Sequence, residues 1–389
     1  MTTLWAFIIL LGVLITIHEF GHFMAARSVG VRVERFSIGI PPRFLTIESI
    51  DDGLLCKLFF FKRTRGSFKW QPVLEKHINR TGRLGSGTEY VVALLPLGGY
   101  VKMAGIIDEN MDTEINYEED EFMSKPLWAK LWILSAGVIM NTILAFILFA
   151  SLGYYQGSAE IKDEPVVRET IGNMPAEMAG IIPGDRIIKI NDNNVKTWSE
   201  LTSLIKTRPN TKIDLVLERD DSMINLEITT TTSVIPVKGG MDTVGVLGIY
   251  PEMVYMSITA KEAISIGFSR TIGSFMMIIE SLRMLGAGDA SVSDFGGPIL
   301  IAQLAGQTAE AGLIPFLTFM ALLSVNLAFL NILPIPGLDG GHILIHLIEA
   351  AIRRPLTLKT RIAIQQIGMA FILILMVTII FQDITRLFN

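Results

Sequence analysis

The sequence predicts a membrane α-helical protein with four spans, a membrane-associated β region on the cytoplasmic side and one small α+β domain outside the cytoplasm. Three observations support this fold class. The 389-residue chain is 50% hydrophobic and only 18% charged, whereas about 25% of the residues in a soluble domain are charged. Four segments are apolar over the roughly 20 residues that a membrane-spanning helix needs. Residues 155–250 look soluble, with the patterns of short strands and two helices.

The four expected spans are residues 4–26, 127–150, 313–334 and 362–381. The N-terminal MTTLWAF lacks a basic region and a cleavage pattern, so we expect the first apolar run to be retained as a span. Small and polar residues inside the second and third spans are of the kind that packs helices together in membranes: Ala136, Gly137, Asn141, Ser324, Asn326 and Asn331.

Basic residues predict the topology. Four arginines follow the first span, and four basic residues lie between the third and fourth: Arg27, Arg32, Arg35, Arg43, Arg353, Arg354, Lys359 and Arg361. The positive-inside rule places both loops in the cytoplasm. Both termini and the region between the second and third spans are then expected on the other side of the membrane, outside the cytoplasm.

The chain accordingly divides into eight regions. They are a first span (1–27), a cytoplasmic-side β-rich loop region (28–126), a second span (127–153), an α+β domain (154–250), a helical tether (251–312), a third span (313–341), a cytoplasmic loop (342–361) and a fourth span with the C-terminus (362–389). The tether is not counted as a span because five charged residues interrupt it: Lys261, Glu262, Arg270, Glu280 and Arg283.

The β-rich region contains GTEYVVALLPLGGYVKM (87–103), in which Gly98 and Gly99 mark a turn or bulge. A strand this apolar is expected to dip into the membrane if protein covers its polar edge. The acidic tract 108–121 is interpreted as a solvated loop. The formal net charge of −5 gives no indication of nucleic-acid binding, and the single cysteine, Cys56, excludes an intrachain disulfide.

The α+β domain is predicted from PAEMAGIIPGDRIIKINDNNV (175–195), which is typical of a short helix, a turn and a strand. An amphipathic helix (198–207) and two further strands, KIDLVLER and INLEITTTT, follow. Together these segments resemble a PDZ domain. PDZ domains add an extended peptide to a sheet edge, so such a peptide is an expected partner.

The motif HEFGH places three ionisable residues inside the first span, where they are costly and usually functional. His18 and His22 are four residues apart, so both project from one helix face and can share a metal ion. Zinc suits two imidazoles and a carboxylate with a fourth position left for water, which Glu19 can reach as general base. The alternative is a structural histidine pair with Glu19 as its ion partner.

A third ligand is offered by NILPIPGLDGGHILIH (331–346), in which Asp339 follows the third span. The predicted topology places Asp339 in the same half of the bilayer as His18 and His22. Gly340 and Gly341 are expected to let the backbone approach another helix. His342 and His346 also share helical spacing, but no glutamate follows either one, so hydrogen bonding or capping is favoured over ligation. His77 is interpreted as a surface histidine.

HEFGH, PLGGYVKM, the PDZ-like domain and NILPIPGLDGG together resemble the site-2 protease family of intramembrane zinc metalloproteases, of the bacterial regulator-of-sigma-E type. The resemblance implies that zinc is bound by His18, His22 and Asp339 and that Glu19 is the catalytic base. It also implies that Asn326 and Asn331 contact the substrate, the alternative being interhelical hydrogen bonds. The strand with Gly98 and Gly99 is expected to pair with unwound substrate.

Three departures from the family pattern stand out. Only one PDZ-like domain is found where larger members carry two. Residues 48–83 have no counterpart, and this basic, aromatic segment is expected either to rest on anionic lipid or to form an ordinary loop. The second span reads AGVIMN, in which Val138 replaces the usual proline and predicts a straighter helix.

The expected function is hydrolysis of transmembrane segments of single-span regulatory proteins, such as anti-sigma factors already cut outside, with remnant signal peptides as further substrates. The expected location is the bacterial inner membrane. Two alternatives remain. One is an inactive zinc-binding chaperone or PDZ scaffold, which would have no need of Glu19. The other is a metal transporter, ranked last because the polar groups all lie on one side of the membrane midplane.

Overall fold

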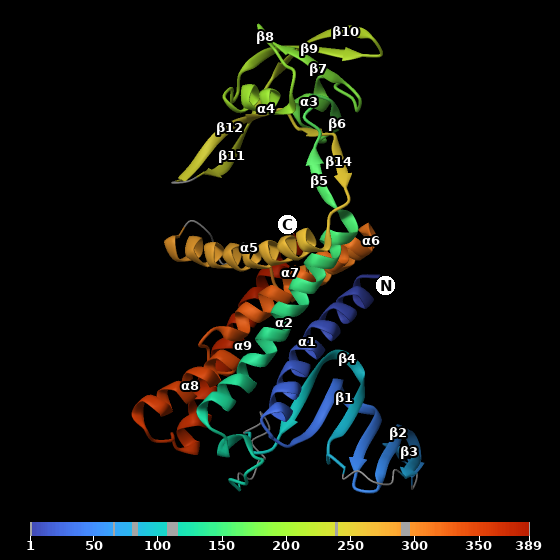
Figure 1. Ribbon diagram of the computed structural model, residues 1–389, viewed down its shortest axis with the longest axis vertical. Helices are drawn as coiled ribbons and strands as arrows, with labels where there is room; N and C mark the ends of the chain where they lie inside the picture. Colours follow the sequence, from blue (N-terminus) through green and yellow to red (C-terminus); the bar gives the residue numbers. More distant parts are fainter. Residues whose placement is uncertain are drawn as a thin grey trace. The chain divides into compact units, whose positions relative to one another are not determined.

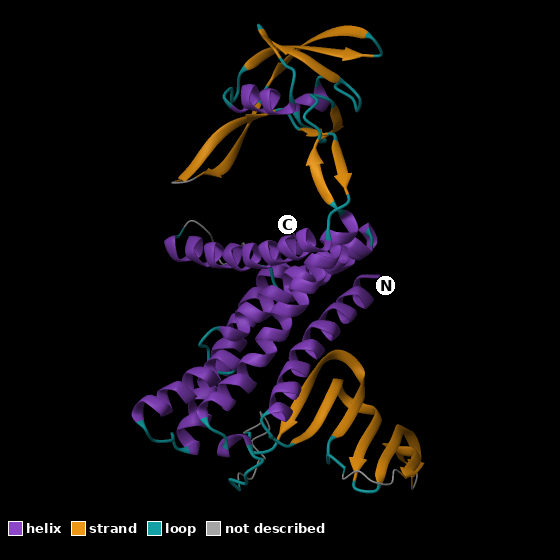
Figure 2. Ribbon diagram, viewed as in Figure 1, coloured by secondary structure: helices purple, strands orange, loops and turns teal. Residues whose placement is uncertain are grey.

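The computed structural model describes residues 2–64, 67–79, 85–106, 116–237, 240–288 and 296–388. The chain forms two compact units, Met1–Leu152 with Lys261–Asn389, and Gly153–Ala260. The first unit contains the long helices and one β-sheet, and the second contains short strands with two small helices (Figure 1, Figure 2).

Seven helices of the first unit account for most of its apolar residues. They are α1 (Thr2–Ser28), α2 (Leu127–Gln156), α5 (Ala260–Ala287), α6 (Pro298–Ala311), α7 (Leu313–Ile332), α8 (Asp339–Ile352) and α9 (Leu358–Phe388). The four expected spans coincide with α1, α2, α7 and α9. Helix α2 is unbroken through Val138, as expected for a helix without the proline.

Helix α5 departs from the expected four spans. Within the described residues, five helices are long and apolar enough to cross a membrane, and α5 is the fifth. Its charges cluster towards its ends, which leaves Arg270 alone in the middle. However, α5 runs across α2 and α7 instead of alongside them (Figure 1). A Cβ on Gly267 would lie 2.7 Å from the Cβ of Ala150, so α5 packs closely on α2.

The sheet of the first unit has the strand order β3-β2-β1-β4. The strands are β1 (Val33–Ile50), β2 (Gly53–Thr64), β3 (Ser67–Asn79) and β4 (Glu89–Met103). Both β1 and β4 fold back, because residues 33–38 lie opposite 99–103 while residues 43–48 lie opposite 89–93. The 99–103 half of β4 pairs with β1 alone and therefore forms an edge of the sheet.

Strand β4 runs beside the middle of α1. The carbonyl oxygen of Pro96 would lie 2.7 Å from a Cβ on Gly12, and Gly98 faces Ile15. Gly12 is about 24 Å from the end of α1 at Ser28, at 1.5 Å per residue. The bend of β4 thus reaches the level of the apolar middle of α1.

Two segments of residues 28–126 differ from simple loops. Within residues 48–83, β2 and β3 form an antiparallel hairpin. The acidic tract 108–121 lies partly outside the described residues. In its described part, the buried Glu121 carboxylate accepts hydrogen bonds from the backbone N–H groups of Asn116 and Tyr117.

The second unit is built from ten strands and two helices among the described residues. They are β5 (Ser158–Ile161), β6 (Val167–Thr170), α3 (Pro175–Met178), β7 (Arg186–Ile190), β8 (Asn193–Asn194), α4 (Trp198–Lys206), β9 (Lys212–Arg219), β10 (Ser222–Thr229), β11 (Thr231–Val237), β12 (Gly240–Val246), β13 (Ile249–Pro251) and β14 (Met253–Met256). Strands β13 and β14 pair with β6 and β5. They therefore belong to this unit, although β14 lies in the segment expected to be a helical tether.

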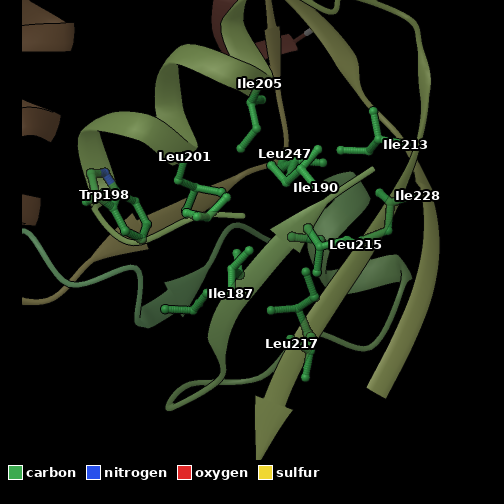
Figure 3. Close-up of a cluster of buried hydrophobic side chains, with 14 residues drawn as sticks. Ile187, Ile190, Trp198, Leu201, Ile205, Ile213, Leu215, Leu217, Ile228 and Leu247 are labelled. Atoms are coloured by element: carbon green, nitrogen blue, oxygen red, sulfur yellow. The ribbon is translucent and has the colours of Figure 1, made fainter. Parts of the chain in front are cut away.

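The core of the second unit lies between α4 and the sheet of β7, β9 and β10. Trp198, Leu201 and Ile205 of α4 point towards Ile187 of β7 and Leu215 of β9 (Figure 3). Leu201, Ile187 and Leu215 have no exposed surface. The amphipathic helix predicted at 198–207 thus covers one face of the sheet.

An ion pair between the buried Asp185 and the partly exposed Arg219 supports this core at its edge. The Asp185 carboxylate accepts hydrogen bonds from Nε and Nη2 of Arg219, at 2.7 and 2.8 Å, and from the backbone N–H of Ile182. Burial by itself raises the pKa of Asp185, but these donors outweigh it and hold the pKa below its usual value. The ionised carboxylate therefore stabilises the folded unit.

We expect Asp185→Asn to lower the stability of this unit at pH 7 by about 1–3 kcal/mol, because Arg219 loses a buried partner. In the wild type, this contribution is present above the unfolded pKa of about 4 and is lost as the pH falls through the folded pKa. Hydrogen exchange of peptides from β7 and β9 in the full chain measures the stability of this unit in each variant. The exposed Asp192→Asn is the control, and equal protection in both variants at pH 7 would contradict the assignment.

Candidate metal centre

The two histidines of α1 continue an apolar stripe. Ala6, Leu10, Leu14, His18 and His22 recur every four residues and are all buried. Because this spacing lies on one helix face, the packing that buries the leucines carries both imidazoles into the interior of the helix bundle. Each histidine is only 7% exposed.

Asp339 meets both histidines. Its Oδ2 lies 3.1 Å from Nε2 of His18 and 3.3 Å from Nε2 of His22, and the two Nε2 atoms are 3.2 Å apart. Within the described residues, these three form the one group of His, Cys, Asp and Glu able to hold a metal ion. The structure thus brings the three predicted ligands together.

The spacing fits zinc. Three atoms bound to zinc at about 2.0–2.1 Å in tetrahedral geometry are roughly 3.3 Å apart, close to the observed separations. Oδ2 of Asp339 is also buried without a hydrogen-bond partner among the described residues. A buried carboxylate oxygen facing two imidazole nitrogens is costly unless a proton or cation lies between them. The residues present therefore suit a divalent ion.

A tight turn between α7 and α8 brings Asp339 to the site. Pro334 and Pro336 lie in this turn, and Asp339 begins α8. A Cβ on Gly340 or Gly341 would collide with the backbone of residues 332–336. Both glycines therefore let this turn close upon itself, whereas the sequence predicted that they allow the approach of another helix.

Outer hydrogen bonds orient both imidazoles. Nδ1 of His22 lies 2.8 Å from the carbonyl oxygen of Ile133, to which it donates as N–H. This leaves Nε2 of His22 with a free lone pair for a metal. The side-chain amide of Asn141 lies 3.3 Å from Nδ1 of His18, and the Ser324 hydroxyl donates to the main-chain carbonyl oxygen of Asn141 at 2.7 Å.

The amide orientation of Asn141 follows from this chemistry. In the structure, Nδ2 of the Asn141 amide faces His18. The other amide atom, Oδ1, is then buried without a hydrogen-bond partner among the described residues. Rotating the amide by half a turn, which exchanges nearly identical atoms, lets Oδ1 accept from Nδ1–H of His18. That arrangement leaves Nε2 of His18 free for the metal. The sequence indicated Asn141 only as a packing residue.

Two glycines let α1 and α2 approach at the site. A Cβ on Gly137 would lie 2.5 Å from Cε1 of His18 and 2.6 Å from Nε2 of His22. A Cβ on Gly21, the glycine of HEFGH, would collide with the carbonyl of Ala136. Gly137 thus leaves the space that the imidazoles fill, a role that the small-residue pattern did not reveal.

Glu19 lies beside the cluster and against β4. Its Cγ would be 3.7 Å from a Cβ on Gly99. A cavity of about 810 Å³ is lined by Glu19, by the three clustered residues, and by Gly99 and Asn331. Neither Asn326 nor Gly98 is among its described lining residues, so their expected contact with substrate gains no support here.

His342 and His346 also line the cavity. Nδ1 of His346 donates to Glu349 at 3.1 Å, and Glu349 pairs with Arg361. Burial, together with the charges of Arg361 and Lys130, lowers the pKa of His346 to about 4, so its imidazole is neutral at pH 7. His346 is therefore a hydrogen-bonded cavity residue, in line with the sequence interpretation. His77 is partly exposed and lies 3.2 Å from Asp52.

Comparison with known proteins gives full-length relatives. The model of peptidase family M50 matches residues 6–62 and 75–375. The chain is 30% identical over 427 residues to the zinc metalloprotease RasP of Bacillus licheniformis, with all of both proteins covered. It is 29% identical over 490 residues to the regulator of sigma E protease of Salmonella typhi, again with all of both covered.

Two further matches were found. The chain is 27% identical over 465 residues to the regulator of sigma-W protease RasP of Bacillus subtilis, which covers 99% of each protein. Among solved structures, a PDZ domain of an SdrC-like protein from Listeria monocytogenes covers 24% of this chain and 92% of its own, with 19% identity and a TM-score of 0.19.

Relatives that match from end to end are zinc metalloproteases, and this chain gathers a zinc-compatible donor set beside a glutamate. This chain is therefore a metalloprotease of the site-2 class, with zinc as its cofactor. More narrowly, the chain belongs to peptidase family M50.

We expect Gly137→Ala to weaken zinc binding roughly 10–100-fold, as changes around metal ligands do, because the new Cβ displaces both imidazoles. Zinc retained by the full-length protein against a competing chelator measures this. Gly273→Ala is the matched control, because a Cβ there meets nothing within 4 Å. Equal zinc affinity in the two variants would show that Gly137 does not lie against the metal site.

Proposed function

We propose that this protein hydrolyses peptide bonds within transmembrane segments of single-span regulatory proteins. In this proposal, His18, His22 and Asp339 hold zinc and Glu19 is the general base. The convergence of these side chains from α1 and α8 is the observation that carries the proposal. Their burial beside apolar helices indicates a substrate that reaches the site from the bilayer.

We place the site in the cytoplasmic half of the bacterial inner membrane. Four spans, α1, α2, α7 and α9, put the basic ends of α1 and α8 on the cytoplasmic side. The PDZ-like second unit then lies outside the cytoplasm. The direction of α5 across α2 and α7 (Figure 1) supports a helix at the outer membrane surface in place of a fifth span.

Strand β4 offers a place for unwound substrate. A helix hides its peptide groups in internal hydrogen bonds, so cleavage requires local unwinding. Residues 99–103 form a sheet edge, and Gly99 lies both on this edge and in the cavity. A substrate segment paired with this edge regains the hydrogen bonds lost on unwinding. We assign Gly98 a conformational role, because its φ of +128° is one that glycine adopts readily.

In the proposed hydrolysis, each polar residue of the cavity has a separate role. When bound, zinc supplies a Lewis acid that polarises the scissile carbonyl and lowers the pKa of water. Glu19 takes a proton from the attacking water and delivers it to the leaving amine nitrogen as the C–N bond breaks. Asn331, which lines the cavity, donates its amide N–H to the developing oxyanion. Asn326 remains a candidate substrate contact.

The substrate class rests on the relatives. One of them is named regulator of sigma E protease, and another is named regulator of sigma-W protease RasP. By analogy, we propose anti-sigma factors already cut outside as substrates, and remnant signal peptides as a second class. The PDZ-like unit would exclude intact ectodomains or bind trimmed chain ends. A catalytically inactive zinc scaffold is the alternative, and the position of Glu19 beside the donor set argues against it.

We expect Glu19→Gln to retain zinc but to abolish cleavage of a single-span substrate reconstituted in the same vesicles. The amide keeps the shape of the side chain but cannot accept the proton. Asp339→Ala, by contrast, should lose both zinc and cleavage. Metal analysis and mass spectrometry of the fragments distinguish the two variants. Undiminished turnover by Glu19→Gln would exclude this residue as the base, and a wild type that binds zinc without cleaving any segment would favour the scaffold.

A further inference from the structure

The hairpin of β2 and β3 carries exposed aromatic side chains. Phe60 and Phe61 are 55% and 58% exposed. Phe61 lies directly opposite Trp70, with ring centroids 4.9 Å apart, and Phe60 lies 6.0 Å from Trp70. An exposed aromatic cluster of this size on a two-stranded hairpin is unfavourable in water and requires a partner. We refer to Phe60, Phe61 and Trp70 as the aromatic tip.

The same segment is strongly basic. Residues 57–76 contain six lysines and arginines and a single glutamate, in a chain whose overall charge is −5. Lys62 and Lys69 lie directly opposite each other next to the aromatic tip. Like charges in this position repel. Among the described residues, the lysine of β2 that forms an ion pair is Lys57, with Glu48, and not Lys62. The pair therefore favours an anion from outside the chain.

The register places this tip at the membrane end of the sheet. Leu58 pairs with Leu45, so Phe61 lies beyond it, towards Arg43 and Ile40. The indole N–H of Trp70 donates to the carbonyl of Arg43 at 2.8 Å. At this same end, Ile40 pairs with Leu95 beside the bend of β4, which runs along the middle of α1.

The family model covers Phe60 and Phe61 of the aromatic tip but not Trp70. The family model matches residues 6–62 and 75–375 but leaves residues 63–74 unmatched. In Figure 1, β2 and β3 form the side of the sheet farthest from α1, where no helix covers them. No residue of 57–76 is among the described residues that line the cavity or form the metal cluster, so the site does not use this part of the hairpin.

We propose that the β2–β3 hairpin is an anchor for anionic phospholipids of the bilayer that this chain spans. The aromatic rings sit at the headgroup level, as tryptophan and tyrosine do in membrane belts. Lys62 and Lys69 bind lipid phosphates, which removes their mutual repulsion. The anchor holds the sheet, and with it the edge of β4, against the cytoplasmic leaflet.

A fluorescent label tests this anchor without using the catalytic activity. The full-length Cys56→Ser protein carries a new cysteine, Phe61→Cys, labelled with an environment-sensitive dye. It is placed in nanodiscs of phosphatidylcholine alone or with added phosphatidylglycerol. We expect a blue shift, together with quenching by lipids brominated near the headgroup, in the anionic discs. Raising the ionic strength from about 0.1 to 1 M, which shortens the Debye length from about 10 to 3 Å, should reverse both.

Charge variants provide the matched control. Lys62→Glu with Lys69→Glu should abolish the response to anionic lipid. Lys196→Glu with Lys206→Glu, the same charge change on exposed lysines of the second unit, should leave it intact. Equal emission in neutral and anionic discs would overturn the proposal, as would a blue shift that lipid quenchers do not affect, because that result indicates a protein partner. Zinc retention by each variant verifies the fold.

Discussion

The structure depends on one buried cluster, His18, His22 and Asp339, whose negative charge and lone pairs need a cation. Two imidazole nitrogens and a carboxylate oxygen approach within about 3 Å of each other among apolar helices, where uncompensated lone pairs are costly. A divalent cation turns that repulsion into binding. The helix packing, the hydrogen bonds behind the rings and the shape of the cavity are all consistent with this one requirement, because each serves to hold the three donors in place.

The positions of the donors depend on contacts that are distant in the sequence. Gly21 and Gly137 allow α1 and α2 to touch, and a chain of hydrogen bonds from Ser324 through Asn141 to His18 ties α7 and α2 to α1. The glycine turn after α7 supplies Asp339. Gly137 of α2 therefore sets the space that is open to the two imidazoles of α1.

The sequence predicted the parts of this arrangement that depend on local patterns. The four apolar helices and the i, i+4 histidines are local features, and the family and its zinc cofactor, inferred from HEFGH and NILPIPGLDGG, are confirmed. The roles of Gly137 and Asn141 were missed because they arise only from packing between helices. Strand β14 was missed because its partner, β5, lies about 90 residues earlier. The β2–β3 hairpin was left open because its strands hardly alternate between apolar and polar residues.

Zinc K-edge X-ray absorption of the full-length protein in nanodiscs tests the central claim most directly. The account predicts two imidazole nitrogens and at least one oxygen at about 2.0–2.2 Å, and it predicts that the metal or its oxygen shell is lost in Asp339→Ala. An unchanged spectrum in Asp339→Ala would contradict it, as would one unchanged in His18→Ala, because zinc would then be bound elsewhere in the chain.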